Sequence, residues 1–262
     1  MRKLENKVVI VTGASMGIGE AIARLFAAEG AKLALAARSF DRLENLAREL
    51  GPDVLPIRAD MTDPNAIHEM ARLTAERFGR IDILINNAGV GMYTAFLDTP
   101  PEQIERLVRT NWLGPMYAIH AVAPYMRKQK SGQIINISSV AGKISIPWMA
   151  TYCSTKFALN ALSYALRMEL AEEKIQVISV CPGRIETPFT NNAIKDAGTL
   201  PMLPGGISAE RVARAVLRAS LKNKREVVVP ASNWAYGLLH DLFPSITDSV
   251  MVRVLRRSMR KQ

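Results

Sequence analysis

Short apolar segments alternate with longer segments of helical periodicity along most of the chain. The short segments are almost continuously apolar and rich in β-branched residues, as buried parallel strands are. They lie at residues 8–11, 33–37, 54–57, 81–85, 134–137, 176–180 and 226–229. Between them, apolar positions recur at helical spacing in residues 18–29, 41–50, 63–78, 101–130, 151–173 and 208–222. The segment 101–130 also contains Pro115 and Pro124, so we expect breaks or kinks there.

This alternation predicts an α/β fold, namely a doubly wound parallel sheet with helices on both faces, in three layers and one domain. We place the domain in residues 1–230 and treat residues 231–262 as a carboxyl-terminal extension. Ligands bind such a sheet beyond the carboxyl ends of its strands, so functional residues are expected there.

The carboxyl-terminal extension holds much of the positive charge of the chain. Residues 248–262 carry five cations and one carboxylate, a net of 5 − 1 = +4, while the whole chain has a formal charge of +10. On a helical wheel the apolar residues fill one broad arc and the cations the opposite arc. The apolar set is Val250, Met251, Val252, Val254, Leu255 and Met259, and the basic set is Arg253, Arg256, Arg257, Arg260 and Lys261. Such a helix suits a membrane surface, its own subunit or a second copy of the chain, and the pattern leaves these open.

Composition narrows the class of protein further. No apolar run approaches the roughly 18 residues that span a bilayer, and the first residues show no signal-peptide pattern. Cys153 and Cys181 are too few for a disulfide framework or a metal-ligand set, and we expect both to be small buried packing residues. Aromatic and basic residues do not interleave as in a nucleic-acid platform. We therefore expect a cytoplasmic protein that holds no metal and binds no nucleic acid, with the extension as a possible membrane contact.

A glycine-rich segment follows the first predicted strand. Residues 12–19 read TGASMGIG, with glycines at positions 13, 17 and 19 before a predicted helix. Glycines allow a tight turn and a close backbone approach, and the helix offers its first N–H groups and its positive dipole end to a pyrophosphate. The spacing is GxxxGxG instead of the commoner GxGxxG. A plain packing turn is the alternative, but the position between strand and helix favours dinucleotide binding.

The end of the second predicted strand indicates which dinucleotide is bound. NAD-binding proteins usually place a carboxylate here for the ribose 2′-hydroxyl, whereas a 2′-phosphate requires a guanidinium. Residues 36–39 contain no carboxylate but do contain Arg38, and Ser15 of the glycine segment could add a hydroxyl. The sequence therefore favours NADP over NAD, with NAD still allowed. The alternative is a solvated arginine at a strand end.

Two further strand ends carry polar or small residues. Asp60 follows the third strand and could accept a hydrogen bond from an adenine amino group, or it could serve only a turn. Asn87, Ala88 and Gly89 follow the fourth strand, where small residues would let a cofactor approach the backbone. A turn again explains the same residues equally well.

Tyr152 and Lys156 stand four residues apart at the start of a predicted helix, so their side chains share one helix face. A cation near a phenol favours the phenolate and would lower a tyrosine pKa that is ordinarily about 10. A positioned phenol of lowered pKa could donate a proton to an alkoxide as it forms in a carbonyl reduction. Ser138 and Ser139 end the fifth predicted strand, and Ser139 could be a second hydrogen-bond donor.

These segments occur in a fixed order: TGASMGIG, NNAG, Asn111, SSVAG, YCSTK and PGRIET. Together they resemble the short-chain dehydrogenase/reductase family of single-domain NAD(P)-dependent oxidoreductases with a Rossmann-like fold. The resemblance runs from about Asn6 to Val229 and is specific as a set. One departure is Met16, which is not the basic residue that some NADP-dependent members carry in the glycine segment.

The resemblance implies a role for each matching residue. Tyr152 would be the catalytic acid/base, Lys156 would lower its pKa and bind the ribose, and Ser139 would polarise the substrate. Asn111 would anchor a water of a proton relay through a backbone group of a kinked helix. The implied cofactor-binding residues are Gly13, Ser15, Met16, Gly17, Ile18, Gly19, Arg38, Asp60, Met61, Asn87, Ala88, Gly89, Tyr152, Lys156, Pro182, Gly183, Ile185 and Thr187.

The resemblance also suggests where the substrate lies. Residues 188–207 would form a loop over it, with Phe189, Leu200, Met202 and Leu203 as an apolar lid. Further apolar residues near the expected site are Met92, Tyr93, Phe96, Ile144, Ile146, Trp148 and Met149, although several of them could simply pack in the core.

The expected activity is the interconversion of a carbonyl, either a ketone or an aldehyde of apolar or acyl type, and its alcohol with NADP(H). We expect a homo-dimer or homo-tetramer, although a long carboxyl-terminal extension could alter the tetramer. Two alternatives remain open. One is an NADP-binding sensor or scaffold without turnover, and the other is a membrane-peripheral protein recruited by the extension.

Overall fold

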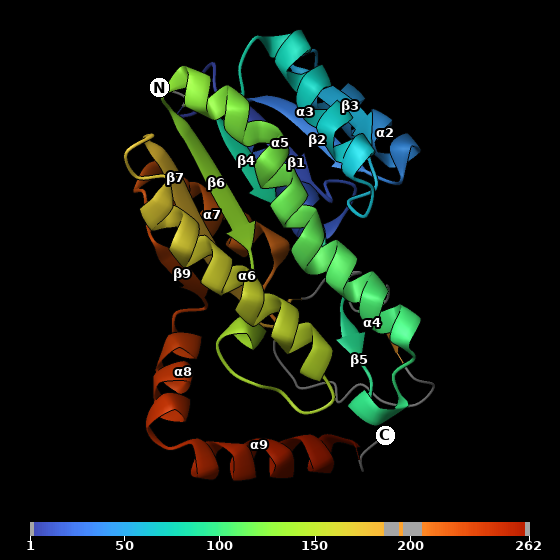
Figure 1. The fold of residues 1–262 in the computed structure, drawn as a ribbon, viewed down its shortest axis with the longest axis vertical. Helices are drawn as coiled ribbons and strands as arrows, with labels where there is room; N and C mark the ends of the chain where they lie inside the picture. Colours follow the sequence, from blue (N-terminus) through green and yellow to red (C-terminus); the bar gives the residue numbers. More distant parts are fainter. Residues whose placement is uncertain (1–2, 186–193, 196–205, 260–262) are drawn as a thin grey trace.

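The computed structural model describes residues 3–185, 194–195 and 206–259. Within these residues the core is one seven-stranded parallel sheet of strand order β3-β2-β1-β4-β6-β7-β9 (Figure 1). The strands are β1 (Val8–Thr12), β2 (Lys32–Ala37), β3 (Val54–Arg58), β4 (Ile83–Asn86), β6 (Gly132–Ile137), β7 (Ile175–Pro182) and β9 (Glu226–Val229). All seven predicted strands are present, and the predicted doubly wound fold is confirmed. A separate pair, β5 (Met92–Tyr93) and β8 (Ile194–Lys195), was not predicted from the sequence.

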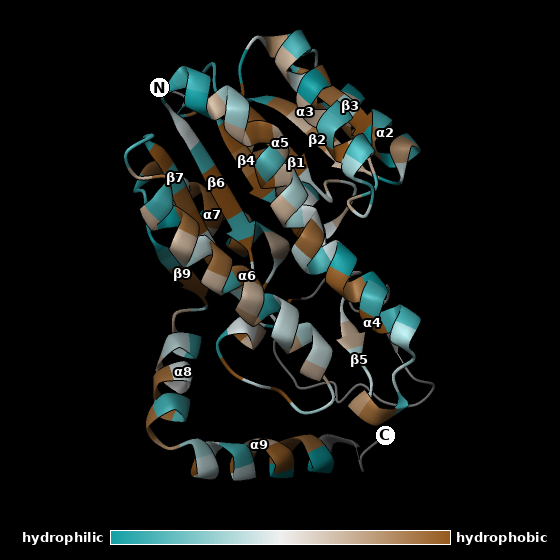
Figure 2. Cartoon of the chain, viewed as in Figure 1, coloured by the Kyte–Doolittle hydropathy of each residue, from teal (hydrophilic) through white to brown (hydrophobic). Residues whose placement is uncertain are grey.

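Helices cover both faces of the sheet. One face carries α1 (Gly17–Ala28), α2 (Phe40–Leu50) and α7 (Ala209–Leu221), and the other carries α3 (Pro64–Phe78), α5 (Gly114–Gln129) and α6 (Ala150–Glu169). The central strand β1 shows how the two cores arise, because successive side chains point to opposite faces. Val9 and Val11 pack in the core under α1, and Ile10 packs in the core under α3 and α5. Figure 2 shows the resulting apolar sheet between helices with hydrophilic outer surfaces.

The long helical segment at 101–130 is interrupted once. It consists of α4 (Pro101–Val108), a π-helical segment η2 (Arg109–Leu113) and α5. Pro115 lies in the first turn of α5, directly after η2. Pro124 lies inside α5 and does not end it, so the break expected at Pro124 is absent. Single π-helical turns often occur at functional sites, and η2 holds Asn111.

The carboxyl-terminal extension forms two helices. In Figure 1, α8 (Ser232–Leu242) continues from β9 beyond the carboxyl ends of the strands, and α9 (Pro244–Met259) runs across below the same end of the molecule. No helix in the described part of the chain is long and apolar enough to cross a bilayer. The division at residue 230 falls between β9 and α8, and the two-part organisation itself stays a prediction.

Asp82 anchors the opposite, amino end of the sheet. Its side chain is buried, and it accepts hydrogen bonds from the Val8 backbone N–H at 2.9 Å and from the Arg80 guanidinium at 2.8 and 2.7 Å. Lys7 Nζ lies 3.4 Å away. Burial alone would raise the pKa of Asp82, but the hydrogen bonds from Arg80 and Val8 outweigh it and hold this pKa below its ordinary value. The carboxylate thus ties the start of β1 to the segment that leads into β4.

We expect Asp82→Asn to lower the free energy of unfolding by about 1–3 kcal/mol at pH 7, because a buried charge-assisted hydrogen-bond set is lost. A carboxyl whose pKa is lowered by folding contributes stability above its unfolded pKa and loses it as pH falls through the folded pKa. The gap between wild type and variant should therefore close as pH drops below about 4. Urea unfolding at several pH values measures it, with the exposed Asp53→Asn as the matched control. A gap that stays constant with pH would contradict this role.

Candidate active site

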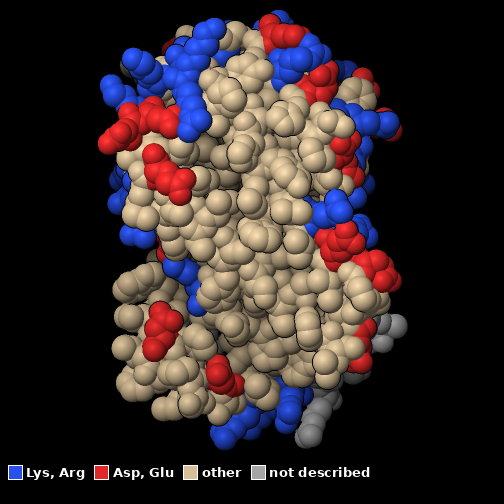
Figure 3. All heavy atoms as spheres, in the orientation of Figure 1, with Lys and Arg blue, Asp and Glu red and all other residues tan. Residues whose placement is uncertain are grey.

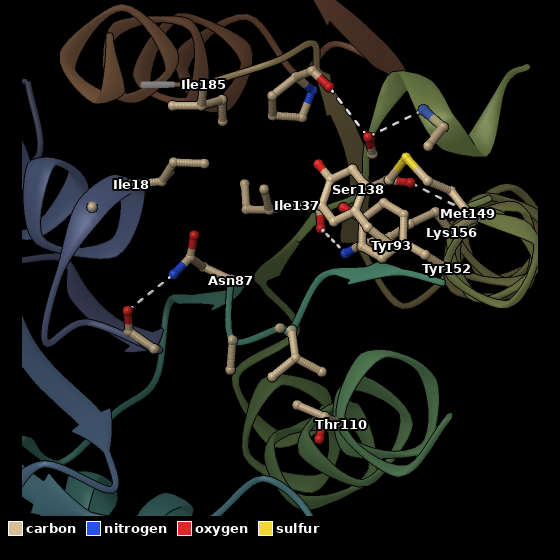
Figure 4. A pocket seen from close by; sticks show the side chains of 18 of the residues that line it. Ile18, Asn87, Tyr93, Thr110, Ile137, Ser138, Met149, Tyr152, Lys156 and Ile185 are labelled. Atoms are coloured by element: carbon tan, nitrogen blue, oxygen red, sulfur yellow. Dashed lines mark hydrogen bonds between the residues drawn. The ribbon is translucent and has the colours of Figure 1, made fainter. Parts of the chain in front are cut away.

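A cavity of about 870 Å³ opens at the carboxyl ends of the strands. The glycine segment after β1 and the end of β2 line one part of it, and residues of β6, α6 and the segment after β7 line the other. Figure 4 shows Tyr152, Lys156, Ser138 and Tyr93 gathered together, with Ile18 and Ile185 facing the cavity from another direction. Segments far apart in the sequence therefore meet where the sequence analysis expected a site.

The glycine segment is shaped by close backbone contacts. Gly13 has φ of +65°, and a Cβ there would lie 2.8 Å from Ala88 Cα. A Cβ on Gly19 would collide with the carbonyl oxygen of Gly13. Gly17, also with positive φ, begins α1. Glycine at these positions lets the segment pack tightly on its neighbours. Ser15, Met16 and Ile18 line the cavity beside the first turn of α1.

Thr12 and Asn87 hold the glycine segment against the end of β4. Thr12 Oγ1 accepts hydrogen bonds from the N–H groups of Asn87 at 3.0 Å and Ala88 at 3.1 Å. Asn87 Nδ2 donates to the carbonyl oxygens of Thr12 at 2.9 Å and Gly13 at 3.2 Å (Figure 4). Asn87, Ala88 and Gly89 all line the cavity, so they act both as a turn and as a wall. The positioning role of Thr12 was not predicted from the sequence, because it depends on a contact between residues 75 positions apart.

Two guanidinium groups stand at the cavity end near β2. Arg38 and Arg42 are both exposed and both line the cavity with Ser39. No carboxylate in the described part of the chain forms an ion pair with either of them, so both charges are available to an anion. Arg42 was not predicted, although its place four residues after Arg38, in the first turn of α2, could have indicated it.

Asp60 and Met61 lie beside this end. Asp60 Oδ1 accepts from the Thr62 backbone N–H and hydroxyl, both at 2.9 Å, which is the turn role considered as an alternative. Asp60 also lines the cavity, and its contact with an adenine stays a prediction. Met61 is buried against Gly114 at the start of α5 while lining the same cavity.

Tyr152 and Ser139 meet at the inner part of the cavity. The Tyr152 side chain is 7% exposed and shares a hydrogen bond with the Ser139 side chain. Ser139 Oγ also accepts from the Ala141 backbone N–H at 3.1 Å and lies 3.4 Å from the carbonyl oxygen of Pro182. The neighbouring Ser138 instead donates to the carbonyl oxygen of Lys156 at 3.2 Å. Of the two serines, Ser139 is therefore the one that the structure sets against the tyrosine hydroxyl.

Lys156 lies one turn from Tyr152 but does not lower the pKa of its phenol. Its Nζ donates to the Ile137 carbonyl oxygen at 3.0 Å and lies 5.8 Å from the centroid of the Tyr152 ring. Burial raises the pKa of Tyr152 above its ordinary value, and the hydrogen bond with Ser139 opposes this only in part. Burial also lowers the pKa of Lys156 to about 8. The expected depression of the tyrosine pKa is thus wrong for this structure, because desolvation dominates at both groups.

Asn111 ties the π-helical segment to the loop after β4. Its side chain is buried, its Oδ1 accepts from the Val90 N–H at 2.8 Å, and its Nδ2 donates to the Val90 carbonyl at 2.9 Å. A longer contact of 3.5 Å reaches Thr155 Oγ1 on α6. The side chain is therefore fully used in holding the loop, which leaves any water-binding role to the backbone of η2.

The segment after β7 closes the cavity from the side of β9. The Gly183 N–H donates to the Val229 carbonyl at 2.7 Å, and Ile185 forms a parallel bridge with Ile207. Pro182, Gly183, Arg184 and Ile185 line the cavity. Thr187 and the proposed lid residues lie outside the described residues, namely Phe189, Leu200, Met202 and Leu203.

The apolar residues expected near the substrate divide into three groups. Tyr93, Ile146, Trp148 and Met149 line the cavity. Met92 and Ile144 are buried without lining it, and Phe96 is 57% exposed. The cavity wall also includes Leu255 of α9, which the sequence analysis did not assign to the site. Cys153 and Cys181, for which a packing role was expected, are both buried free thiols.

Lys156 should impose a stability cost that depends on pH. Its pKa in the folded chain is about 8, below the ordinary 10.5, so the unfolded chain binds more protons between these pH values. Stability should therefore rise as pH increases from 8 to 10.5, and the cost below pH 8 is about 3 kcal/mol. We expect Lys156→Met to stabilise the cofactor-free chain at pH 7, with the gain shrinking toward pH 10. Thermal unfolding across this range tests it, with Lys128→Met, which is exposed, as the control. A gain that does not change with pH would contradict the assignment.

Comparison with known proteins agrees with this geometry. A family model described as short chain dehydrogenase matches residues 7–198. An uncharacterized oxidoreductase of Staphylococcus saprophyticus is 42% identical over 196 residues, which cover 73% of this chain and 79% of that protein. A 3-ketoacyl-(acyl-carrier-protein) reductase from Brucella melitensis, solved with NADH, has a TM-score of 0.80 at 27% identity and covers 87% of this chain and 98% of its own.

An alcohol dehydrogenase from Thermococcus sibiricus, solved with 5-hydroxy-NADP, has a TM-score of 0.76 at 31% identity. That match covers 85% of this chain and 95% of the other. The family model spans well over half of the chain, and the two solved structures share its fold. The chain therefore belongs to the short-chain dehydrogenase family, and it is an oxidoreductase of that type.

Proposed function

We propose that the protein is an NADP(H)-dependent oxidoreductase that interconverts an apolar or acyl-type carbonyl and its alcohol. The observation that carries the proposal is the convergence of Tyr152, Ser139 and Lys156 on the inner part of one cavity, with the Ser139 side chain beside the Tyr152 hydroxyl. Both hydroxyls reach one point of a cavity whose other end has a glycine-lined backbone and two cations. A ketone or aldehyde oxygen placed at that point would meet two hydrogen-bond donors.

The residues of the cavity fit a dinucleotide. Glycine at positions 13 and 19 lets the segment pack closely on Ala88 and on itself. This packing sets the first turn of α1 at the cavity wall, where its N–H groups could bind a pyrophosphate. Arg38 and Arg42 stand at the end where the adenosine would lie. When bound, the nicotinamide supplies or accepts the hydride. The segment from Pro182 to Ile185 would hold it near Tyr152.

The side chains of this chain would handle the proton and the developing charge. Tyr152 would give its proton to the carbonyl oxygen as that oxygen becomes an alkoxide, and Ser139 would donate a hydrogen bond to it. A phenol with a raised pKa stays protonated at neutral pH, as a donor in the reductive direction must. Lys156, already held by the Ile137 carbonyl oxygen, would bind ribose hydroxyls of the cofactor. Asn111 would keep the loop under the cavity in place.

Cofactor preference rests on charge. A 2′-phosphate would meet Arg38 and Arg42, neither of which has a carboxylate partner in the described chain, and residues 36–39 offer no carboxylate to a ribose 2′-hydroxyl. This supports NADP over NAD, while NAD remains a possible cofactor. The walls formed by Tyr93, Ile146 and Trp148 support an apolar substrate.

A homo-dimer or homo-tetramer and a cytoplasmic location stay predictions. In Figure 3 a broad strip of surface over α5 and α6 carries few charged side chains, which supports an association with a second copy. The alternative of an NADP-binding sensor without turnover has less support, because Ser139, Tyr152 and Lys156 are all present around one cavity.

We expect Tyr152→Phe to lower the rate of carbonyl-dependent NADPH oxidation by about 100-fold or more, since the proton donor is lost while the ring remains. NADPH binding, followed by nicotinamide fluorescence, should change little. Tyr93→Phe, which alters another tyrosine of the same cavity, is the matched control and should keep most of the activity. Equal turnover by wild type and Tyr152→Phe would refute the assigned mechanism. Binding of NADPH without turnover across a broad carbonyl panel would instead support the sensor.

We expect Arg38→Asp to weaken NADPH binding by about 10- to 100-fold, as the loss of a charge-assisted phosphate contact implies, and to leave NADH binding nearly unchanged. The measurement is the dissociation constant of each cofactor by fluorescence titration. Arg48→Asp, on the neighbouring helix α2 but outside the cavity wall, makes the same charge change and serves as the control. An unchanged ratio of the two dissociation constants would refute the role of Arg38.

A further inference from the structure

The two helices of the extension expose an unusual amount of apolar surface. Within α8, α9 and the residue between them, eight large apolar side chains are more than two-fifths exposed. We call them the outer face: Trp234, Leu238, Leu239, Leu242, Phe243, Ile246, Val250 and Val254. Exposed large apolar residues concentrated on two successive helices indicate an interaction site, because singly scattered ones are normal but concentrated ones are not.

Helix α9 has two distinct sides. Ile246, Val250 and Val254 recur every fourth residue, so they form one exposed stripe. Thr247 and Leu255 are each only 3% exposed and lie on the side that packs against the protein. The apolar residues that share one arc of the helical wheel therefore have two environments in the structure, one buried and one exposed. The inward part docks on its own subunit, whereas Val250 and Val254 are exposed, and a membrane contact of the extension stays a prediction.

Cations border the exposed stripe. Arg253 and Arg257 follow Val250 by three and seven residues, which places them on the same side of the helix as the stripe. The exposed stripe therefore lies where the apolar arc of the helical wheel meets the basic arc. None of Arg253, Arg256 and Arg257 forms an ion pair with any carboxylate in the described part of the chain, and all three are exposed. Figure 3 shows Lys and Arg atoms along the lower edge of the molecule, where Figure 1 places α9.

The inward side of α9 belongs to the active-site cavity. Leu255 lines that cavity together with Tyr93, Trp148 and Tyr152. The helix that carries the outer face is therefore also a wall of the cavity. Whatever binds the outer face would lie next to the substrate end of the site.

We propose that the outer face of α8 and α9 docks on an anionic lipid surface, and that the active site takes an apolar carbonyl compound from that surface. Apolar side chains beside unpaired arginines on one helix face suit the boundary between headgroups and acyl chains. The arginines add attraction to anionic headgroups, which a neutral protein partner would not use. The lipid-docking part stands on the outer face alone, and the delivery part rests on the proposed carbonyl oxidoreductase function.

Docking is tested by sedimentation of the full chain with phosphatidylcholine vesicles that contain 30% or 0% phosphatidylserine. We expect binding to the anionic vesicles to fall roughly 10-fold or more in Arg253→Glu/Arg257→Glu and to weaken with salt. Arg77→Glu/Lys128→Glu makes the same charge change at exposed positions of α3 and α5 and should bind like wild type.

The apolar contribution is tested with Ile246→Ser/Val250→Ser, which should also bind roughly 10-fold more weakly. Met168→Ser/Leu221→Ser changes two similarly exposed apolar residues elsewhere and is the matched control. Because all of these side chains are exposed, the variants should fold, which circular dichroism checks.

Failure of wild type to sediment, or equal sedimentation of all variants, would overturn the docking. Light scattering completes the test: a wild-type oligomer that the serine variant loses, without sedimentation, would assign the outer face to a second copy and also overturn it.

Delivery is tested by the rate of NADPH oxidation with one long-chain ketone, either incorporated in anionic vesicles or dissolved in detergent-free buffer at low concentration. We expect the vesicle-to-dissolved rate ratio to fall at least 5-fold in both outer-face variants and in neither control. If the outer-face variants no longer sediment with vesicles but keep the wild-type rate ratio, the delivery part of the proposal is overturned and the docking part is retained. If wild type turns over neither form of the ketone nor any member of the carbonyl panel, the proposed function fails, and with it delivery, while sedimentation still decides docking.

Discussion

The contact between the glycine segment and the end of β4 is the constraint on which the site depends. Thr12 accepts two hydrogen bonds from Asn87 across this contact, and Gly13 lies so close to Ala88 that no side chain fits between them. These contacts hold the backbone of the glycine segment against the end of β4, and the first turn of α1 lines the cavity. The N–H groups of that turn could bind a phosphate.

Burial of Tyr152 and Lys156 is the second physical constraint on the site. Tyr152 and Lys156 are almost wholly removed from solvent, and this burial opposes the charged form of both. The protein accepts a buried amine that would be more stable in water, which is typical of a group kept for chemistry instead of packing. Ile137 and Ser139 provide the hydrogen bonds that hold the pair in position.

The extension joins the site to the outside of the molecule. Leu255 of α9 forms part of the cavity wall, while Val250 and Val254 of the same helix face away from the protein. A single helix therefore links the substrate end of the cavity to an apolar surface bordered by arginines. The usual division between a catalytic domain and an appended tail does not describe this arrangement well.

Local patterns were enough to predict the strands, the helices around them and the family, because buried parallel strands and glycine turns leave strong signals in a sequence. The sequence also pointed to most residues of the cavity wall, from Gly13 to Ile185. Three features depend on contacts between distant segments and are visible only in the folded protein. They are the hydrogen bonds between Thr12 and the end of β4, the inward packing of Leu255 of α9, and the raised pKa of Tyr152. Local spacing predicted a lowered tyrosine pKa, but burial by many surrounding elements raised it, and no short pattern records how deeply a side chain is buried.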